Sequence, residues 1–348
     1  MRELIITVQE EGQRLDRYLG RYLPKASSGF LHKMLRKKNI KRNGKKAEGS
    51  EKLVQGDRLE IFFSEETFAA LGAVQGAVAV SDRGKQVGSG RNLNPQQKKL
   101  RSQVKILYRD QDVIALHKPA GMLTQKASAK DDSLNDFLYD YWMIHNMKGK
   151  DIPSSFRPSV CNRLDRNTSG IVLCGITVNG LQRLSSLLKK RSLEKYYLCI
   201  VKGRLEGRKK VRGFVRKDKE NNIMHYYEKN VPGSTPIETW YEVLDCTDEA
   251  SLLKVRLITG KSHQIRIHMA SLGHPILGDA KYGDREENRS LMREGIRWQM
   301  LHSYEMVFPS CKTGSDTAED TLCGLRIVDD VPEVFLRLLK RYHLRSDF

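Results

Sequence analysis

Apolar residues in the first sixty positions fall into short periodic groups. LIITV (4–8) predicts a strand, and the leucines and tyrosines of 14–23 recur at helical spacing. Ser27 offers a cap for a second helix, and Asn43-Gly44 predicts a tight turn. LVQGDRLEIFF (53–63) predicts a turn followed by a strand. These elements together indicate a compact unit over residues 1–63.

The apolar pattern from residue 105 onward predicts more strands than helices. Two short strands over 104–118 are joined by a charged turn at Asp110–Asp112, and Thr177 is placed to cap a helix over 178–188. Further strands are predicted over 193–203, 237–246 and 250–260, and a basic amphipathic helix over 332–345. Because strands and helices do not alternate regularly, we expect an α+β fold with a mixed, mostly antiparallel sheet.

The stretch between these two regions differs in composition. Residues 64–104 are rich in Gly, Ala, Ser and Gln and show little periodicity, which predicts a partly flexible linker. The sequence therefore predicts three parts: a small α/β domain (1–63), a linker (64–104) and a larger domain (105–348).

Charge and cysteine usage narrow the class of protein. The 348 residues carry a formal charge of +19, which favours a polyanionic partner, most often nucleic acid. No apolar run reaches the roughly 20 residues of a membrane helix, and no apolar signal core follows Met1. The six cysteines form no CxxC pair, which argues against a zinc site and predicts reduced thiols. We expect a cytoplasmic protein without a membrane partner.

A basic block follows the second predicted helix. Eight of the fourteen residues from Lys33 to Lys46 are Lys or Arg, and none is acidic. Like charges at helical spacing repel each other, so a purely solvated face would favour mixed signs. We therefore expect the block to bind RNA phosphates through Lys33, Arg36, Lys37, Lys38, Lys41, Arg42, Lys45 and Lys46.

The segment CNRLDRNTSGIVLCG (161–175) places Asp165 among turn-forming residues directly before a buried strand. A carboxylate on such a loop, flanked by Arg163 and Arg166, is suited to meet an anionic ligand. An aspartate at this position also serves as a structural Asx turn, and spacing alone leaves both interpretations open.

Two further segments carry candidate chemistry. In ITGKSHQIRIHMASLGHP (258–275) the apolar spacing predicts a helix that ends at Gly273, with Arg266 in its first turn. The three histidines of this segment match no metal-binding spacing, so no metal is expected. In EKYYLCIVKG (194–203) Tyr196 and Tyr197 alternate on a strand, and a tyrosine beside a cleft can stack on a base or exchange a proton.

The N-terminal segments RLDRYL, FLHKMLRKKNIKRNGKKA and VQGDRLEI resemble the alpha-L RNA-binding motif. The later segments HKPAGML, RLDRNTSG, EKYY and GKSHQIRIH…GHPILGDAKYG, in that order, resemble the RluA type of pseudouridine synthase, which acts on large-subunit ribosomal RNA and transfer RNA. That resemblance covers residues 105 to about 310.

The resemblance implies an isomerase that converts specific uridines to pseudouridine without a cofactor. It implies that Asp165 is the essential aspartate, that Tyr197 is the active-site tyrosine, and that Arg266 pairs with the aspartate. Arg163 matches the residue that fills the gap left by the flipped-out uridine. The expected partner is RNA, ribosomal in the first place and transfer RNA in the second, and the expected state is a monomer.

Two other classes compete with this interpretation. A non-catalytic RNA-binding factor of ribosome assembly would suit the charge and the alpha-L motif, but it leaves Asp165, Tyr197 and Arg266 unexplained. A glycosidase or nucleosidase would require a pair of carboxylates, and the sequence offers one strong candidate.

Overall fold

The computed structural model describes residues 1–7, 10–72, 93–128, 130–146, 156–218, 223–310 and 321–348. The N-terminal part forms a small antiparallel sheet of order β1-β4-β2-β3 with two helices packed on it. Its elements are β1 (Arg2–Ile5), α1 (Leu15–Tyr22), α2 (Ser28–Arg36), β2 (Ile40–Arg42), β3 (Lys45–Lys46) and β4 (Arg58–Ile61).

Local sequence signals explain how these elements begin and end. The Ser27 hydroxyl accepts a hydrogen bond from the amide of Phe30 and so caps α2, as expected. Asn43 and Gly44 both have positive φ, the conformation that the turn between β2 and β3 requires. The periodic leucines and tyrosines of α1 are buried against the sheet.

Both ends of the stretch predicted as a linker are helical. Helix α3 (Glu65–Ala70) buries Phe68 completely in the N-terminal core, so this unit extends beyond residue 63. Helix α4 (Pro95–Arg101) begins with a capping box between Asn94 and Gln97. The middle of the predicted linker, 73–92, lies outside the described residues.

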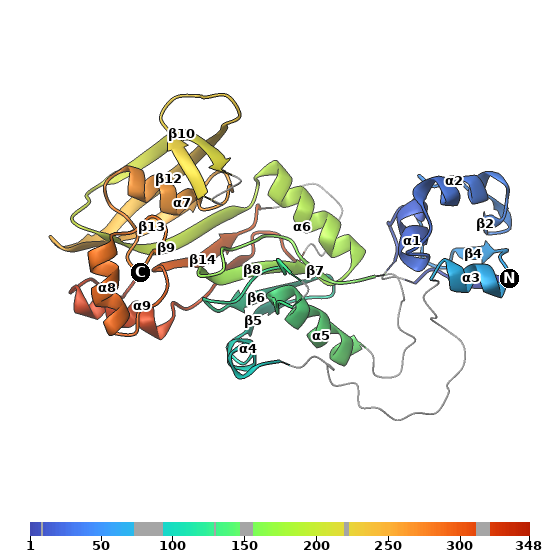
Figure 1. The fold of residues 1–348 in the computed structure, drawn as a ribbon, viewed down its shortest axis with the longest axis horizontal. Coiled ribbons are helices and arrows are strands. Elements are labelled where there is room, and N and C mark those ends of the chain that lie inside the picture. The colour runs from blue at the N-terminus through green and yellow to red at the C-terminus, as the bar shows by residue number, and fades with distance from the viewer. Residues whose placement is uncertain (8–9, 73–92, 129, 147–155, 219–222, 311–320) are drawn as a thin grey trace.

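The larger part is built on one mixed sheet. Among the described residues it has eleven strands, with the path β11-β10-β12-β13-β9-β14-β8-β6-β5, and β15 and β7 pair with β14 and β8 (Figure 1). Neighbouring strands are antiparallel in this described sheet, except that β14 and β8 are parallel. The α+β prediction is confirmed. The strands are β5 (Lys105–Arg109), β6 (Val113–Lys118), β7 (Ser159–Val160), β8 (Ser169–Gly175), β9 (Glu194–Lys202), β10 (Arg208–Asp218), β11 (Ile223–Tyr227), β12 (Thr235–Cys246), β13 (Ala250–Leu257), β14 (Leu301–Val307) and β15 (Arg326–Val328).

Helices cover both faces of the sheet, which explains why the central strand β8 is buried along its whole length. On β8, Val172 and Cys174 pack in the cluster that contains α5, while Ile171 and Leu173 pack in the cluster that contains α6 (Figure 1). The helices are α5 (Leu134–Asn146), α6 (Val178–Lys190), α7 (Gln264–Ser271), α8 (Arg285–Arg293) and α9 (Glu333–Arg341).

Gly170 allows β8 and β14 to approach each other closely. Its φ is +115°, and a Cβ atom there would lie 2.3 Å from the carbonyl oxygen of Ser303. Only glycine fits this position. The glycine of the RLDRNTSG motif therefore fixes the strand that directly follows Asp165.

The cysteines depart in one place from the expectation of reduced thiols. Cys161, Cys174, Cys199 and Cys246 are free, whereas Cys323 is disulfide-bonded, so that expectation is wrong at Cys323. No helix in the described part of the chain is long and apolar enough to span a membrane.

Candidate active site

Asp165 lies on the loop that joins β7 to β8. The loop turns tightly, because the amide of Thr168 donates to the carbonyl oxygen of Asp165 at 3.1 Å. The side chain of Asp165 is 24% exposed, so its carboxylate can be reached from solvent while it contacts the protein.

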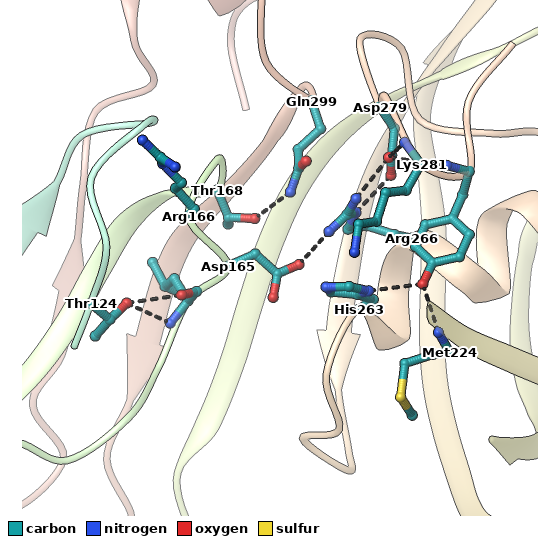
Figure 2. A network of polar contacts seen from close by, with 12 residues as sticks. Thr124, Asp165, Arg166, Thr168, Met224, His263, Arg266, Asp279, Lys281 and Gln299 are labelled. Carbon is teal, nitrogen blue, oxygen red and sulfur yellow. Dashed lines mark hydrogen bonds and ion pairs between the residues drawn. The ribbon is translucent and has the colours of Figure 1, made fainter. Parts of the chain in front are cut away.

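Two side chains from the preceding segment hold this loop in place. Thr124 donates its hydroxyl to the carbonyl of Leu164 at 2.8 Å and accepts from the amide of Leu164 at 3.2 Å (Figure 2). The amine of Lys118 has no exposed surface and donates to the carbonyls of Pro119, Met122 and Arg166 at 2.8–3.0 Å. Burial lowers the pKa of Lys118 to about 7, although the nearby Asp165 acts in the opposite direction.

Arg266 projects from the first turn of α7, as the sequence predicted, and connects two carboxylates. Its Nη1 donates to Asp165 at 2.8 Å, while its Nε and Nη2 donate to the two oxygens of Asp279 at 2.7 and 2.8 Å (Figure 2). The Arg266 side chain is 7% exposed and that of Asp279 is sealed. The guanidinium is therefore fixed by Asp279 and presents its remaining edge to Asp165.

Asp279 lies on the turn that follows α7 and was not singled out from the sequence. Its Oδ1 also accepts from the amides of Lys281 and Tyr282 at 2.9 and 3.2 Å. Burial alone would raise its pKa, but the hydrogen bonds from Arg266 and from these amides lower the pKa below the usual value. Its signal in the sequence was its place in the GDAKYG segment, which is part of the family resemblance but received no role of its own there.

The charges of Arg266, Asp279 and Asp165 stabilise one another. Burial acts to lower the pKa of Arg266, but the carboxylates of Asp279 and Asp165 outweigh it and raise that pKa further. The guanidinium is thus permanently charged next to Asp165. A partly exposed carboxylate beside a fixed cation can act on a ligand as a nucleophile or a base.

Tyr197 lies in the middle of the sheet, on β9 between β13 and β14. Its ring is 6% exposed and belongs to the main apolar core. Burial raises its pKa to about 12; a hydrogen bond with the Ser303 side chain opposes the shift, and the charge of Asp165 adds to it. The phenol therefore keeps its proton at neutral pH. Tyr196 points to the opposite face, where it donates to Glu194, as strand alternation requires.

A second polar chain borders Arg266. The ring of Tyr282 lies 5.1 Å from the guanidinium carbon of Arg266, and its hydroxyl contacts Nδ1 of His263 at 2.8 Å. The same hydroxyl accepts from the amide of Met224 on β11 at 3.2 Å. Burial lowers the pKa of His263, which keeps this imidazole neutral at pH 7. The chain thus links β11 to the residues that hold Asp165 (Figure 2).

The two arginines beside Asp165 behave differently. Arg163 is exposed and forms no ion pair within the described residues. Arg166 is also exposed, but its Nε donates to the carbonyl of Gly121 at 3.1 Å, which tethers the guanidinium to the neighbouring turn.

The predicted RNA-binding cations belong to α2, the turn that follows it and the β2–β3 hairpin, away in sequence from the Asp165 loop. Most are exposed, whereas Lys41 and Arg42 are half-buried. Arg42 is paired with Asp57 at 2.6 Å and with Glu51 at 3.6 Å, so part of its charge is neutralised within the fold. The exposed cations are Lys33, Arg36, Lys37, Lys38, Lys45 and Lys46.

Metal ligation finds no support in the described residues. No group of three or more histidine, cysteine or carboxylate side chains there is arranged to hold an ion. The three histidines of the 258–275 segment contact protein groups instead: His263 contacts Tyr282, His268 contacts Thr239, and His274 contacts the carbonyl of Lys202.

The mixed sheet and the pairing of Asp165 with Arg266 agree with what the sequence resemblance to pseudouridine synthases implied. Residues 112–271 match the family model for RNA pseudouridylate synthase. The chain is 31% identical over 307 residues to ribosomal large subunit pseudouridine synthase C of Rickettsia bellii, with 87% of this chain and 92% of that protein covered. It is 29% identical to the protein of the same name from Escherichia coli K12, with 89% of each chain covered. The chain belongs to the RNA pseudouridylate synthase family and is an isomerase that acts on RNA.

A solved structure agrees with this assignment at the level of the fold. The human RNA pseudouridylate synthase domain containing 4 superposes with a TM-score of 0.55 at 21% identity, and covers 72% of this chain and 96% of its own.

Proposed function

We propose that this enzyme isomerises uridine in large-subunit ribosomal RNA and that Asp165 is its catalytic carboxylate. The observation that carries the proposal is the contact of Asp165 with Arg266 at 2.8 Å, with Arg266 itself anchored on the sealed Asp279. The relatives named for large-subunit ribosomal RNA support the choice of substrate. Transfer RNA is the second candidate, on the sequence resemblance.

The reaction transfers uracil from a nitrogen to a carbon linkage with no net oxidation. The target nucleotide first leaves its stack and enters the site, at a cost of a few kcal/mol. Asp165 then acts at the ribose, the bond from N1 to C1′ breaks, and uracil rotates. The bond from C5 to C1′ forms, which frees Asp165 from its interaction with the ribose. The C5 proton is lost to solvent, and N1, which kept the electron pair of the broken bond, takes up a proton from solvent. The residues of this site need no cofactor for these steps.

The other site residues have supporting roles in this proposal. Arg266 orients Asp165 through a charge-assisted hydrogen bond. Tyr197 stacks on the uracil and, as a phenol that holds its proton at neutral pH, takes part in proton transfer. Arg163, exposed next to Asp165, fills the gap that the flipped uridine leaves in the RNA.

The two parts of the chain have different roles in this proposal. The N-terminal unit binds RNA phosphates through its exposed cations, with Arg166 contributing beside the active site, and residues 105–348 catalyse the reaction. We propose that the enzyme works as a monomer in the cytoplasm, where ribosomal RNA is the available substrate.

Release of tritium from RNA labelled at C5 of uridine tests the function directly. The purified chain is incubated with large-subunit ribosomal RNA and, separately, with transfer RNA from a strain that lacks the protein. We expect tritium release from ribosomal RNA, because the target position is still an unmodified uridine in RNA from that strain. Tritium release from transfer RNA alone would mean that transfer RNA, and not ribosomal RNA, is the substrate. Release from neither RNA would support the alternative of a non-catalytic assembly factor.

A further inference from the structure

His263 directly precedes α7 and has a backbone conformation that is unusual for its residue type. Its φ is +57°, in the left-handed region that is unfavourable for residues other than glycine. The imidazole is half-buried beside the side chains of Arg266 and Tyr282 (Figure 2). Backbone conformations of this kind cluster at active sites, where the surrounding structure holds them. His263 has none of the catalytic roles in the proposed function, so its position calls for an explanation.

One nitrogen of the His263 ring is fixed by the protein, and the other has no protein partner. Nδ1 contacts the hydroxyl of Tyr282 at 2.8 Å. Nε2 makes no hydrogen bond or ion pair with the described residues, and it is not sealed from solvent. Figure 2 shows this nitrogen on the side of the ring that faces Asp165. Nε2 therefore borders the space in front of the Asp165 carboxylate.

The hydrogen bonds of Tyr282 assign the proton of the His263 ring. The oxygen of Tyr282 accepts from the amide of Met224 at 3.2 Å, and Nδ1 of His263 is the described acceptor for the phenolic hydrogen. Burial lowers the pKa of His263, and the nearby charge of Asp165 only partly opposes this shift, so the ring is neutral. A neutral imidazole whose Nδ1 accepts carries its hydrogen on Nε2. His263 thus presents an N–H donor beside Asp165.

A donor at this place matches the charge that develops in the reaction. When the bond from N1 to C1′ breaks, uracil keeps the electron pair, and its negative charge is shared by N1 and the carbonyl oxygens O2 and O4. Fixed donors that face atoms which gain negative charge lower the barrier, because these atoms bind them more strongly in the transition state than before it. The ribose and phosphate oxygens gain no negative charge in this step. The uracil oxygens are therefore the acceptors that profit from the His263 donor.

We propose that His263 donates a hydrogen bond from Nε2 to O2 or O4 of the target uracil and stabilises the negative charge of the detached base. The proposal rests on the proposed pseudouridine synthase reaction. His263 keeps its proton throughout: C5 of the uracil bonds to C1′, the C5 proton goes to solvent, and N1 takes up a proton from solvent. Tyr282 is a positioning residue, because its hydroxyl holds Nδ1 and so turns Nε2 toward the substrate.

Arg266 and Lys281 also bring N–H groups to this part of the site. The guanidinium of Arg266 is already bound to Asp165 and Asp279. The side chain of Lys281 is exposed, whereas the ring of His263 is held by Tyr282. A donor that is already held in place needs no reorganisation when the charge develops, which favours His263. Lys281 is therefore tested beside His263.

Replacing each uracil oxygen by sulfur identifies the hydrogen bond, because sulfur is a weak acceptor. RNA with uridine, 2-thiouridine or 4-thiouridine at the mapped target position, tritiated at C5, is turned over by wild type and variants under single-turnover conditions. His263→Leu removes the donor, and His263→Gln keeps an N–H near the position of Nε2. Lys281→Met removes the neighbouring amine.

Two further variants control for folding. His274→Leu removes another half-buried histidine, which contacts the carbonyl of Lys202 at the end of β9. His263→Asn suits the left-handed backbone, and its amide is too short to reach the position of Nε2. It replaces His263→Leu in the comparison if circular dichroism shows that His263→Leu is unfolded.

We expect His263→Leu to slow turnover of uridine RNA about 100-fold, and His263→Gln to slow it about tenfold or less. Sulfur at one position, O2 or O4, should slow wild type about 3- to 10-fold more than it slows His263→Leu, the loss of one hydrogen bond. The effect of sulfur on the leaving group itself is common to both enzymes and cancels in this ratio. His274→Leu should show the wild-type ratio.

Equal sulfur effects in wild type and His263→Leu overturn the proposal. A sulfur effect that disappears in Lys281→Met and persists in His263→Leu assigns the donor to Lys281 and also overturns it. The same holds if His274→Leu loses the effect as His263→Leu does. Turnover of unmodified RNA by wild type tests the enzyme function separately, because it needs no variant.

Discussion

Two of the three guanidinium nitrogens of Arg266 are bound to Asp279, a carboxylate with no exposed surface. Only the third nitrogen reaches Asp165. Because Asp279 fixes the plane of the guanidinium, the position of the Asp165 carboxylate depends on a residue that is fully buried.

Arg266→Lys tests the need for a planar fork. One ammonium cannot hold Asp279 with two parallel hydrogen bonds and reach Asp165 as well. We expect kcat to fall about 1,000-fold, the range seen when a preorganised charged donor is removed. Tritium release is the measurement, and circular dichroism controls for folding. A rate within tenfold of wild type would show that the pairing does not matter for catalysis.

Asp279→Asn tests the anchor. Removing one partner of a buried pair leaves the other charge uncompensated, at a cost of roughly 3–5 kcal/mol in the free energy of unfolding. We expect the variant to lose both stability and activity, because Arg266 turns away from its present plane.

Leu291→Ala is the matched control for this variant. Leu291 is a fully buried residue of α8, and its truncation costs a similar 2–5 kcal/mol without touching Arg266. At a temperature where both variants remain folded, Leu291→Ala should keep its activity. Equal loss in the two variants would reduce Asp279 to a general stabilising residue.

Lys118→Met tests how the loop that carries Asp165 is held. The substitution leaves the carbonyls of Pro119, Met122 and Arg166 without their shared donor, and we expect roughly 2–5 kcal/mol of destabilisation.

The stability difference between wild type and Lys118→Met depends on pH, and the direction of this dependence follows from the pKa of Lys118. The pKa of Lys118 is about 7 in the fold and about 10.4 in the unfolded chain, so between these values the unfolded state binds more protons. Stability contributed by this residue therefore rises with pH. Urea unfolding at pH 7 and pH 9 should show a wider gap between wild type and Lys118→Met at pH 9. A gap of equal size at the two pH values would mean that the three carbonyls keep the amine charged in the fold.

Tyr197→Phe separates the two roles proposed for this residue. The variant keeps the ring for stacking and loses the proton, so we expect kcat to fall about 100-fold, as for loss of a general acid or base. Because the pKa of the phenol is about 12, the wild-type pH profile should show no ionisation of Tyr197 below pH 10. An unchanged kcat would mean that Tyr197 acts by stacking on the base alone and takes no part in proton transfer.

The sequence predicted the strand and the helix that carry the site residues, but it did not predict the buried charged residues that hold the site in place. Periodicity found the strand of Tyr197 and the helix of Arg266, because each has an apolar face that repeats at a regular spacing. The resemblance paired Arg266 with Asp165 across 101 positions. Asp279 and Lys118 were not found, because a buried charge looks like an ordinary surface charge until its partners are known. Phe68 was missed since one buried ring in a polar helix leaves no period.

Lys37→Gln with Lys38→Gln tests the exposed cations of the N-terminal unit. Each lost phosphate contact lowers the slope of log affinity against log salt by about 0.7–0.9, so the double variant should lower it by about 1.5. Lys25→Gln with Lys52→Gln removes the same charge elsewhere in that unit and should leave the slope nearer to wild type. Equal slopes for the two double variants would exclude specific contact by Lys37 and Lys38.

Asp165→Asn gives the most direct measurement of the central claim. The substitution keeps the shape of the side chain and removes its negative charge. We predict that tritium release from labelled ribosomal RNA falls below a thousandth of the wild-type rate, while the RNA Kd stays within about threefold. Turnover of the variant at the wild-type rate would contradict the account.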